Sequence, residues 1–155
     1  MREGRWMVGG ALALVLAAGT IDATRAAAML NLTEDHLDRY TGMDDYAAAK
    51  ARIFRGAEAQ VLNRDDPRSM AMAQAELEVL TFGLDAPRGD TDFGVAAGKL
   101  VRGRQEILPV AELAIRGAHN TANALAACAL GSTMGISFEA LVAGLRSFKG
   151  LPHRL

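Results

Sequence analysis

The chain has 155 residues, of which 17 are basic and 18 acidic, with a formal net charge of −1, and half of its residues are apolar. This length suits one domain with a packed core, and the balanced charge excludes a global attraction to nucleic acid or an anionic membrane. We therefore expect no nucleic-acid partner. A single cysteine, Cys128, excludes an intramolecular disulfide framework and a multi-cysteine zinc site.

The N-terminal segment differs in composition from the rest. Arg2 and Arg5 precede an apolar run over residues 7–18. A transmembrane helix needs roughly 20 apolar residues, so no stable membrane span is expected. Three interpretations remain open: a signal peptide, a buried strand or helix, or a translation start joined to a damaged gene. We treat residues 1–25 as an atypical apolar segment and residues 26–155 as one domain.

The first half of that domain alternates between strand-like and helix-like segments. Gly56 marks the end of the first predicted helix, and Asp66 followed by Pro67 marks the start of the second. The predicted order is strand, helix, strand, helix, strand over residues 26–32, 44–55, 60–63, 67 to about 75, and 78–82. This alternation is typical of a parallel α/β sheet.

The second half is predicted to add a hairpin and two helices. The hairpin covers residues 93–102 and turns at Ala97-Gly98. One helix covers residues 120–130 and ends at Gly131, and another covers residues 138–148, capped by Ser137, with Gly150 at its end. The fold class is therefore α/β, a mostly parallel sheet flanked by helices with a small β-hairpin.

Two charged positions in the first half are candidates for chemistry. His36 lies among three acidic residues just after the first predicted strand, where open α/β sheets place ligand sites. Imidazole and carboxylates together suit a metal or a phosphate-bearing substrate, although a solvated acidic loop is the simpler interpretation. Lys50 lies within an alanine-rich helix, and its spacing alone indicates an ordinary solvated lysine.

Two further motifs lie in the second half. Asn120 and Asn123 are three residues apart at a helix start, so both carboxamides share one face beside unpaired backbone N–H groups. They suit recognition of a purine edge or a phosphate, while N-capping by Asn120 is the common alternative. Arg154 follows Pro152-His153 and suits either a phosphate clamp or a surface turn.

Taken together and in this order, four motifs resemble those of the Mur ligases. They are Asn31-Leu-Thr-Glu-Asp-His-Leu-Asp-Arg-Tyr40, Asp45-Tyr-Ala-Ala-Ala-Lys-Ala-Arg-Ile-Phe54, Gly117-Ala-His-Asn-Thr-Ala-Asn-Ala-Leu-Ala-Ala127 and Gly150-Leu-Pro-His-Arg154. The resemblance runs from about residue 26 to residue 155, and the last motif is most similar to the branch that adds D-glutamate.

The resemblance implies an ATP-dependent reaction in peptidoglycan precursor synthesis. ATP would phosphorylate the terminal carboxylate of UDP-N-acetylmuramoyl-L-alanine, and the amine of D-glutamate would attack the acyl phosphate. By the same resemblance, His36 and Lys50 act in catalysis and bind Mg²⁺, with Lys50 as a carbamate that offers anionic oxygen atoms. His119, Asn120, Asn123 and Arg154 would bind ATP.

The chain also departs from the family pattern. Its lysines, Lys50, Lys99 and Lys149, lie outside any glycine-rich phosphate loop, and the family's metal-binding glutamate has only Asp22 in its neighbourhood. We expect a truncated ligase, the later part of a central ATPase domain without its UDP-binding and C-terminal domains, inactive alone and of unknown oligomeric state. The alternative is a non-catalytic nucleotide- or partner-binding remnant. The expected location is cytoplasmic, or exported if residues 1–19 form a signal peptide.

Overall fold

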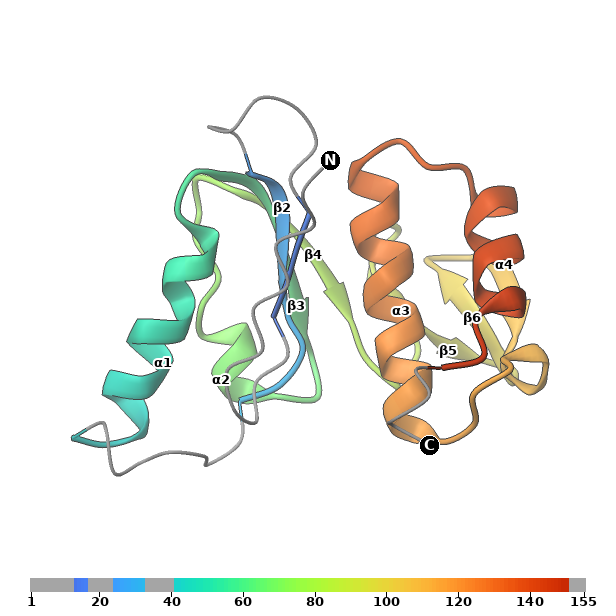
Figure 1. The fold of residues 1–155 in the computed structure, drawn as a ribbon, viewed down its shortest axis with the longest axis horizontal. Helices are drawn as coiled ribbons and strands as arrows, with labels where there is room; N and C mark the ends of the chain where they lie inside the picture. The colour runs from blue at the N-terminus through green and yellow to red at the C-terminus, as the bar shows by residue number, and fades with distance from the viewer. Residues whose placement is uncertain (1–12, 17–23, 33–40, 151–155) are drawn as a thin grey trace. The chain divides into compact units, whose positions relative to one another are not determined.

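The protein is described here by a computed structural model, which covers residues 13–16, 24–32 and 41–150 (Figure 1). The chain divides into two compact units, Met1–Leu80 and Thr81–Leu155. This boundary falls inside the segment 26–155 that the sequence predicts as one domain.

Among its described residues, the first unit has three paired strands. Strand β1 (Ala13–Leu16) is antiparallel to β2 (Thr24–Met29), and β2 is parallel to β3 (Ala57–Asn63). The N-terminal apolar run therefore contains a strand, which agrees with one of its three interpretations. Residues 26–29 of β2 are all buried, on both faces of the strand, as expected for a strand in parallel pairing.

Helices cover these strands and complete an apolar core. Helix α1 (Met43–Ala51) continues into the 3₁₀ turn η2 (Arg52–Phe54), which confirms the predicted helix and its end before Gly56. In Figure 1, α1 and the short helix α2 (Pro67–Met70) lie beside β2 and β3. The buried residues of this core are Ala27, Met29, Leu32, Tyr46, Phe54, Leu62 and Met72.

Helix α2 begins as predicted but is much shorter than predicted. Asp66 is its N-cap and Pro67 its first residue, yet the helix ends at Met70 instead of near residue 75. The reason is tertiary, because the fully buried Gln60 of β3 binds the chain that follows. Its Nε2 donates to the carbonyl of Met72 at 2.9 Å, and its Oε1 accepts from the amide of Gln74 at 2.7 Å. These bonds take the backbone groups that a longer helix would need.

The second unit contains a meander of strands. The end of β4 (Glu78–Phe82) pairs in parallel with β5 (Phe93–Ala96), and β6 (Lys99–Arg102) is antiparallel to β5. The predicted hairpin is confirmed, and both turn residues, Ala97 and Gly98, have positive φ as a two-residue turn requires. Strand β7 (Gln105–Pro109), antiparallel to β6, was not predicted.

Two helices pack against these strands (Figure 1). Helix α3 (Ala118–Thr133) contacts β5 and α4 (Phe138–Ser147), and α4 contacts β7. The Ser137 hydroxyl caps α4 by accepting from the amide of Ala140, which confirms that cap. The α/β class is thus confirmed.

The predicted end of α3 at Gly131 is wrong. The helix continues through this residue to Thr133, and Gly131 is buried. A Cβ placed there would lie 2.5 Å from Cδ2 of Leu141 on α4. Gly131 is therefore a close-approach residue between two helices and not a helix stop.

Candidate functional site

The first candidate region is the edge at which β2 and β3 end. Asn63 is the last residue of β3, and its Nδ2 donates to the carbonyl of Leu30 at 2.6 Å. The buried Ser69 hydroxyl donates to the carbonyl of Met29 at 3.0 Å and accepts from the amide of Asn63 at 2.9 Å. Side chains at and just after the end of β3 therefore bind the backbone at the end of β2. No pattern in the sequence marks Asn63 or Ser69 for this role.

Lys50 lies in the last turn of α1, in the same unit, and is half-buried. Its Nζ is 5.2 Å from the centre of the Tyr46 ring, which makes a cation–π contact. His36 falls in residues 33–40, outside the described residues, so the predicted pairing of His36 with Lys50 stays a prediction. Within the described segments, the structure contains no group of three His, Cys, Asp or Glu residues able to hold a metal ion.

A hollow of about 230 Å³ lies between α1 and α2. Alanine side chains and Met72 form its apolar surface, and Asp44 and Arg68 contribute the charged side chains. Lys50 is not among the residues that line it. The hollow is therefore not a binding cavity for the metal predicted at Lys50.

The second candidate region is a pocket of about 130 Å³ in the second unit. Asn120 and Asn123, both in the first half of α3, line it together, as their spacing predicts. The remaining lining is apolar and comes from the chain before α3, from α3 itself and from the end of α4: Leu113, Ala114, Ile115, Ala124, Ala127, Leu145 and Phe148. Two carboxamides in an apolar pocket can bind both donor and acceptor atoms of a flat heterocycle.

The N-capping interpretation of Asn120 is wrong. Gly117 occupies the cap position of α3, and Asn120 lies inside the first turn. The Nδ2 of Asn120 donates backwards to the carbonyl of Arg116 at 2.8 Å. This bond holds the carboxamide in one orientation and leaves its oxygen as an acceptor.

The other predicted nucleotide-binding residues are not brought to this pocket. His119 lies on α3 but is exposed and is not among the lining residues. Arg154 and its neighbour His153 fall in residues 151–155, outside the described residues. A role for either residue remains a prediction.

An ion pair that is not among the sequence predictions joins two walls of the pocket. The 3₁₀ turn η3 (Val110–Glu112) precedes the lining residue Leu113, and α4 carries the lining residue Leu145. Arg146 of α4 donates to one oxygen of Glu112 from Nε at 2.8 Å and from Nη2 at 2.5 Å. In the sequence, the one feature the two residues share is an apolar neighbour that lines the pocket: Glu112 precedes Leu113, and Arg146 follows Leu145.

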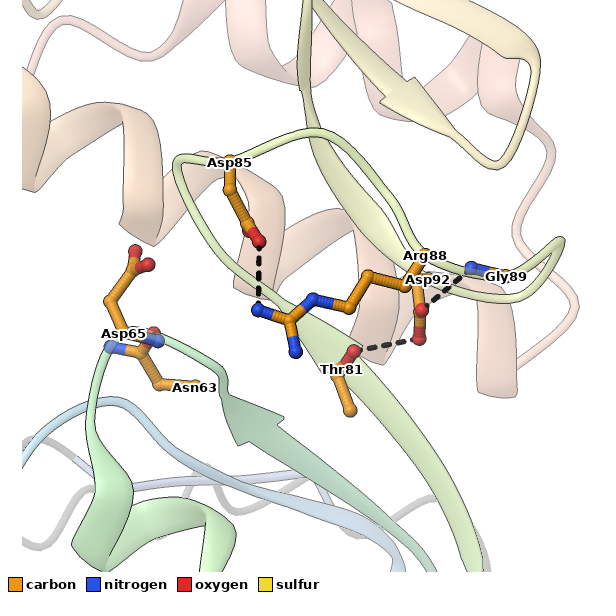
Figure 2. A network of polar contacts seen from close by, with 7 residues as sticks. All are labelled: Asn63, Asp65, Thr81, Asp85, Arg88, Gly89 and Asp92. Atoms are coloured by element: carbon orange, nitrogen blue, oxygen red, sulfur yellow. Dashed lines mark hydrogen bonds and ion pairs between the residues drawn. The ribbon is translucent and has the colours of Figure 1, made fainter.

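The connection between β4 and β5 is also held by side chains (Figure 2). One oxygen of Asp92 accepts from the hydroxyl of Thr81 at 2.7 Å, and the other accepts from the amide of Gly89 at 2.9 Å. Arg88 and Asp85 form an ion pair at 3.5 Å in the same connection. These contacts explain a long ordered connection for which the sequence predicts no element.

None of the described helices combines the length and the apolar character that crossing a bilayer requires.

Comparison with known proteins places the chain in a family. A family model, the Mur ligase middle domain, matches residues 17–131, and the chain belongs to this family. The resemblance drawn from the four motifs is thereby confirmed.

Relatives within the family are considerably longer. The chain is 54% identical over 136 residues to UDP-N-acetylmuramoylalanine--D-glutamate ligase of Thiobacillus denitrificans, a match that covers 88% of this chain and 28% of the relative. It is 53% identical over 137 residues to the ligase of the same name from Methylobacillus flagellatus, with 86% and 30% covered. The chain thus spans less than a third of these relatives.

A solved structure supports the same assignment. UDP-N-acetylmuramoyl-L-alanyl-D-glutamate--2,6-diaminopimelate ligase matches with a TM-score of 0.66 and 27% identity, over 84% of this chain and 29% of that chain. The α/β arrangement described above is therefore that of a Mur ligase middle domain.

Proposed function

We propose that this chain contributes part of the nucleotide site of an ATP-dependent ligase that joins D-glutamate to UDP-N-acetylmuramoyl-L-alanine. Family membership and the names of the relatives support this reaction class. The observation that carries the proposal is the pocket that Asn120 and Asn123 line together. We assign this pocket to the adenine ring of ATP.

The pocket fits a ring and not a whole nucleotide. Its volume of about 130 Å³ is close to the roughly 150 Å³ of an engineered apolar cavity that binds benzene. Apolar side chains would contact the faces of the base, and the carboxamides would bind its edge. The sugar and phosphates would therefore extend beyond the pocket.

Magnesium would be held by His36 and a carbamylated Lys50 in this proposal. An unmodified Lys50 offers only donor hydrogens and cannot ligate a cation, whereas a carbamate supplies the oxygen atoms that Mg²⁺ prefers. The ion would offset the charge of the phosphates during phosphoryl transfer. Carbamylation of Lys50 would replace the cation–π contact between its ammonium and the Tyr46 ring with an anionic group.

The alternative proposal is nucleotide binding without turnover. It is favoured by one sequence observation: these 155 residues contain no glycine-rich loop that ends in lysine and serine or threonine. Without that loop the phosphates of ATP lose their usual backbone cradle. We therefore expect no phosphate release from ATP by this chain with both substrates present.

Calorimetric titration of the 155-residue chain with ATP, adenosine and GTP tests the assignment. We expect ATP and adenosine to bind and GTP to bind more weakly. Asn123→Ala should weaken adenosine binding about three- to tenfold, the equivalent of one neutral hydrogen bond. Gln74→Ala removes an exposed carboxamide from the other unit and should change nothing.

Three results separate the alternatives. If Asn123→Ala and the unmodified chain bind adenosine with equal affinity, the assignment of the pocket to the adenine ring is wrong. Binding without phosphate release would favour the non-catalytic alternative. Substrate-dependent phosphate release would instead establish turnover by this chain.

A further inference from the structure

Among the described residues, Phe148 is the most exposed large apolar one. Three large apolar side chains are exposed in this part of the chain: Leu84 at 39%, Ile136 at 41% and Phe148 at 54%. Of these, Phe148 alone lines the pocket that Asn120 and Asn123 share. Contact of an aromatic ring with water is unfavourable, and a flat ligand in the pocket would remove part of that contact. The exposed surface therefore lies where a ligand would cover it.

Phe148 is also the aromatic residue among those that line the pocket. The other apolar residues of the lining are leucine, isoleucine and alanine. Elsewhere in the second unit, the rings of Phe93 and Phe138 contact each other edge to face, with their centres 6.5 Å apart. Within the described part of the chain, the ring of Phe148 has no aromatic or cationic partner of this kind. Its face is thus left for a ligand.

The backbone that carries the Phe148 ring is fixed at the end of α4. The amide of Phe148 donates to the carbonyl of Gly144 at 3.0 Å and closes the last turn of the helix. Two residues earlier, Arg146 is joined to Glu112, which precedes the lining residue Leu113. The end of α4 is therefore held at two points before a ligand binds, and such preorganisation lowers the entropic cost of binding.

We propose that Phe148 is the residue on which the base of the nucleotide stacks. This inference rests on the proposed function, in which the pocket holds the adenine ring of ATP. Two elements then divide the recognition: Phe148 at the end of α4 contacts a face of the base, and Asn120 and Asn123 of α3 bind its edge. Every base has a π-face, so stacking adds affinity for any purine, whereas the carboxamides select among purines.

Replacing Phe148 by leucine and by tyrosine separates stacking from ordinary apolar contact. Leucine keeps an apolar side chain without a π-face, whereas tyrosine keeps the ring. In calorimetric titrations of the full chain, Phe148→Leu should bind adenosine and inosine about five- to tenfold more weakly, the lower range of base–aromatic stacking. Phe148→Tyr should stay within about twofold of the unmodified chain, because its ring still stacks.

Ile136→Ala is the control for the loss of exposed apolar surface. Ile136 belongs to the same unit and is exposed, but it does not line the pocket. Its replacement should leave both nucleoside affinities unchanged. Because more than half of the Phe148 side chain is exposed, its variants should also fold like the unmodified chain, which thermal unfolding checks.

Fluorescence of Phe148→Trp gives a readout that a purely structural role would not change. An indole ring that stacks on a purine loses fluorescence, and the unmodified chain, whose one tryptophan is Trp6, supplies the background. Adenosine should quench the added tryptophan of Phe148→Trp and leave the emission of the unmodified chain as it is. Binding of adenosine to Phe148→Trp without this quenching would contradict stacking.

The outcomes distinguish this role from the proposed function. If Phe148→Leu binds adenosine like the unmodified chain while Asn123→Ala binds it more weakly, the stacking role is wrong and the proposed function stands. If the unmodified chain binds adenosine and inosine equally and Phe148→Leu weakens both, the stacking role stands and the assignment to adenine is wrong. An unmodified chain that binds neither nucleoside contradicts both.

Discussion

Gln60 is the buried polar residue whose replacement should cost most in the first unit. It is fully buried on β3, and its carboxamide makes two hydrogen bonds to the backbone after α2, at Met72 and Gln74. In Gln60→Leu both backbone groups lose their partner while the volume of the side chain is nearly kept. The free energy of unfolding should fall because of lost polar contacts and not because of a cavity.

The size of the loss follows from the surroundings of each bond. The bond to the Met72 carbonyl is buried, so leaving that carbonyl unpaired costs about 1–3 kcal/mol. The bond to the Gln74 amide is only partly buried, and water can replace Gln60 there, so its loss costs about 0.5–1.5 kcal/mol. We expect a total of about 1.5–4.5 kcal/mol, a large part of the 5–15 kcal/mol that stabilises a typical domain.

Urea unfolding followed by circular dichroism, with amide exchange at Gln74, measures this loss. Gln74→Leu is the matched control, since it makes the same change at an exposed side chain and keeps the amide that Gln60 binds. The control should stay within about 0.5 kcal/mol of the unmodified chain. If Gln60→Leu also stays within that limit and Gln74 remains protected, the assigned role of Gln60 is refuted.

Three further predictions concern the second unit. Burial raises the pKa of the Cys128 thiol from 9.0 to about 12. Between these pH values only the unfolded chain loses the thiol proton, so the free energy of unfolding falls as pH rises. Urea unfolding should show a loss of about 1.4 kcal/mol between pH 8 and pH 10, relative to the Cys128→Ala variant. Gly144→Ala should stabilise α4 by about 0.5–1 kcal/mol, because an added Cβ meets nothing within 4 Å there. Gly131→Ala should gain less stability, because its Cβ would clash with Leu141. Thermal unfolding of both variants measures the difference. The exposed pair Glu112–Arg146 should have a coupling energy of about 0.5 kcal/mol in a double-mutant cycle, and a coupling that persists in about 1 M NaCl would contradict its electrostatic origin.

Short-range sequence patterns correctly predict the strands, turns and helix caps whose stabilising contacts lie close together in the chain. The strand at residues 78–82 and the hairpin around Ala97-Gly98 have the predicted bounds, because β-branched or apolar runs and a turn with positive φ leave few alternatives. Ser137 and Asp66 cap their helices for the same reason. In each case the decisive contact lies within a few residues along the chain.

The predictions that are wrong depend on contacts between distant residues. The end of α2 is set by Gln60, which lies seven residues before the helix and binds beyond its end. Gly131 lies inside α3, where Leu141 of the next helix approaches so closely that a Cβ would clash. Strand β7 is an edge strand that begins with two exposed polar residues, Gln105 and Glu106, and ends with a proline, so its hydrophobic pattern is weak.

The candidate site divides in the same way. Helical spacing predicts that Asn120 and Asn123 share a surface, and they line one pocket. The apolar walls of that pocket come from three separate segments, within residues 113–115, 124–127 and 145–148, and their association depends on the packing of α4 against α3. The spacing of residues within one helix cannot predict which apolar residues of other segments pack against it.

Carboxylates near strand ends have a structural use in both units, which affects how acidic motifs are interpreted. Asp66 binds the amides of Leu32 and Arg68, one with each oxygen, and Asp92 binds Thr81 and Gly89 in the same divided manner. A buried strand must satisfy its last backbone groups, and a carboxylate can satisfy two donors from different segments at once. Asp66, the second residue of the acidic pair Asp65-Asp66 after a parallel strand, therefore holds the end of β2 and the start of α2 together with one carboxylate.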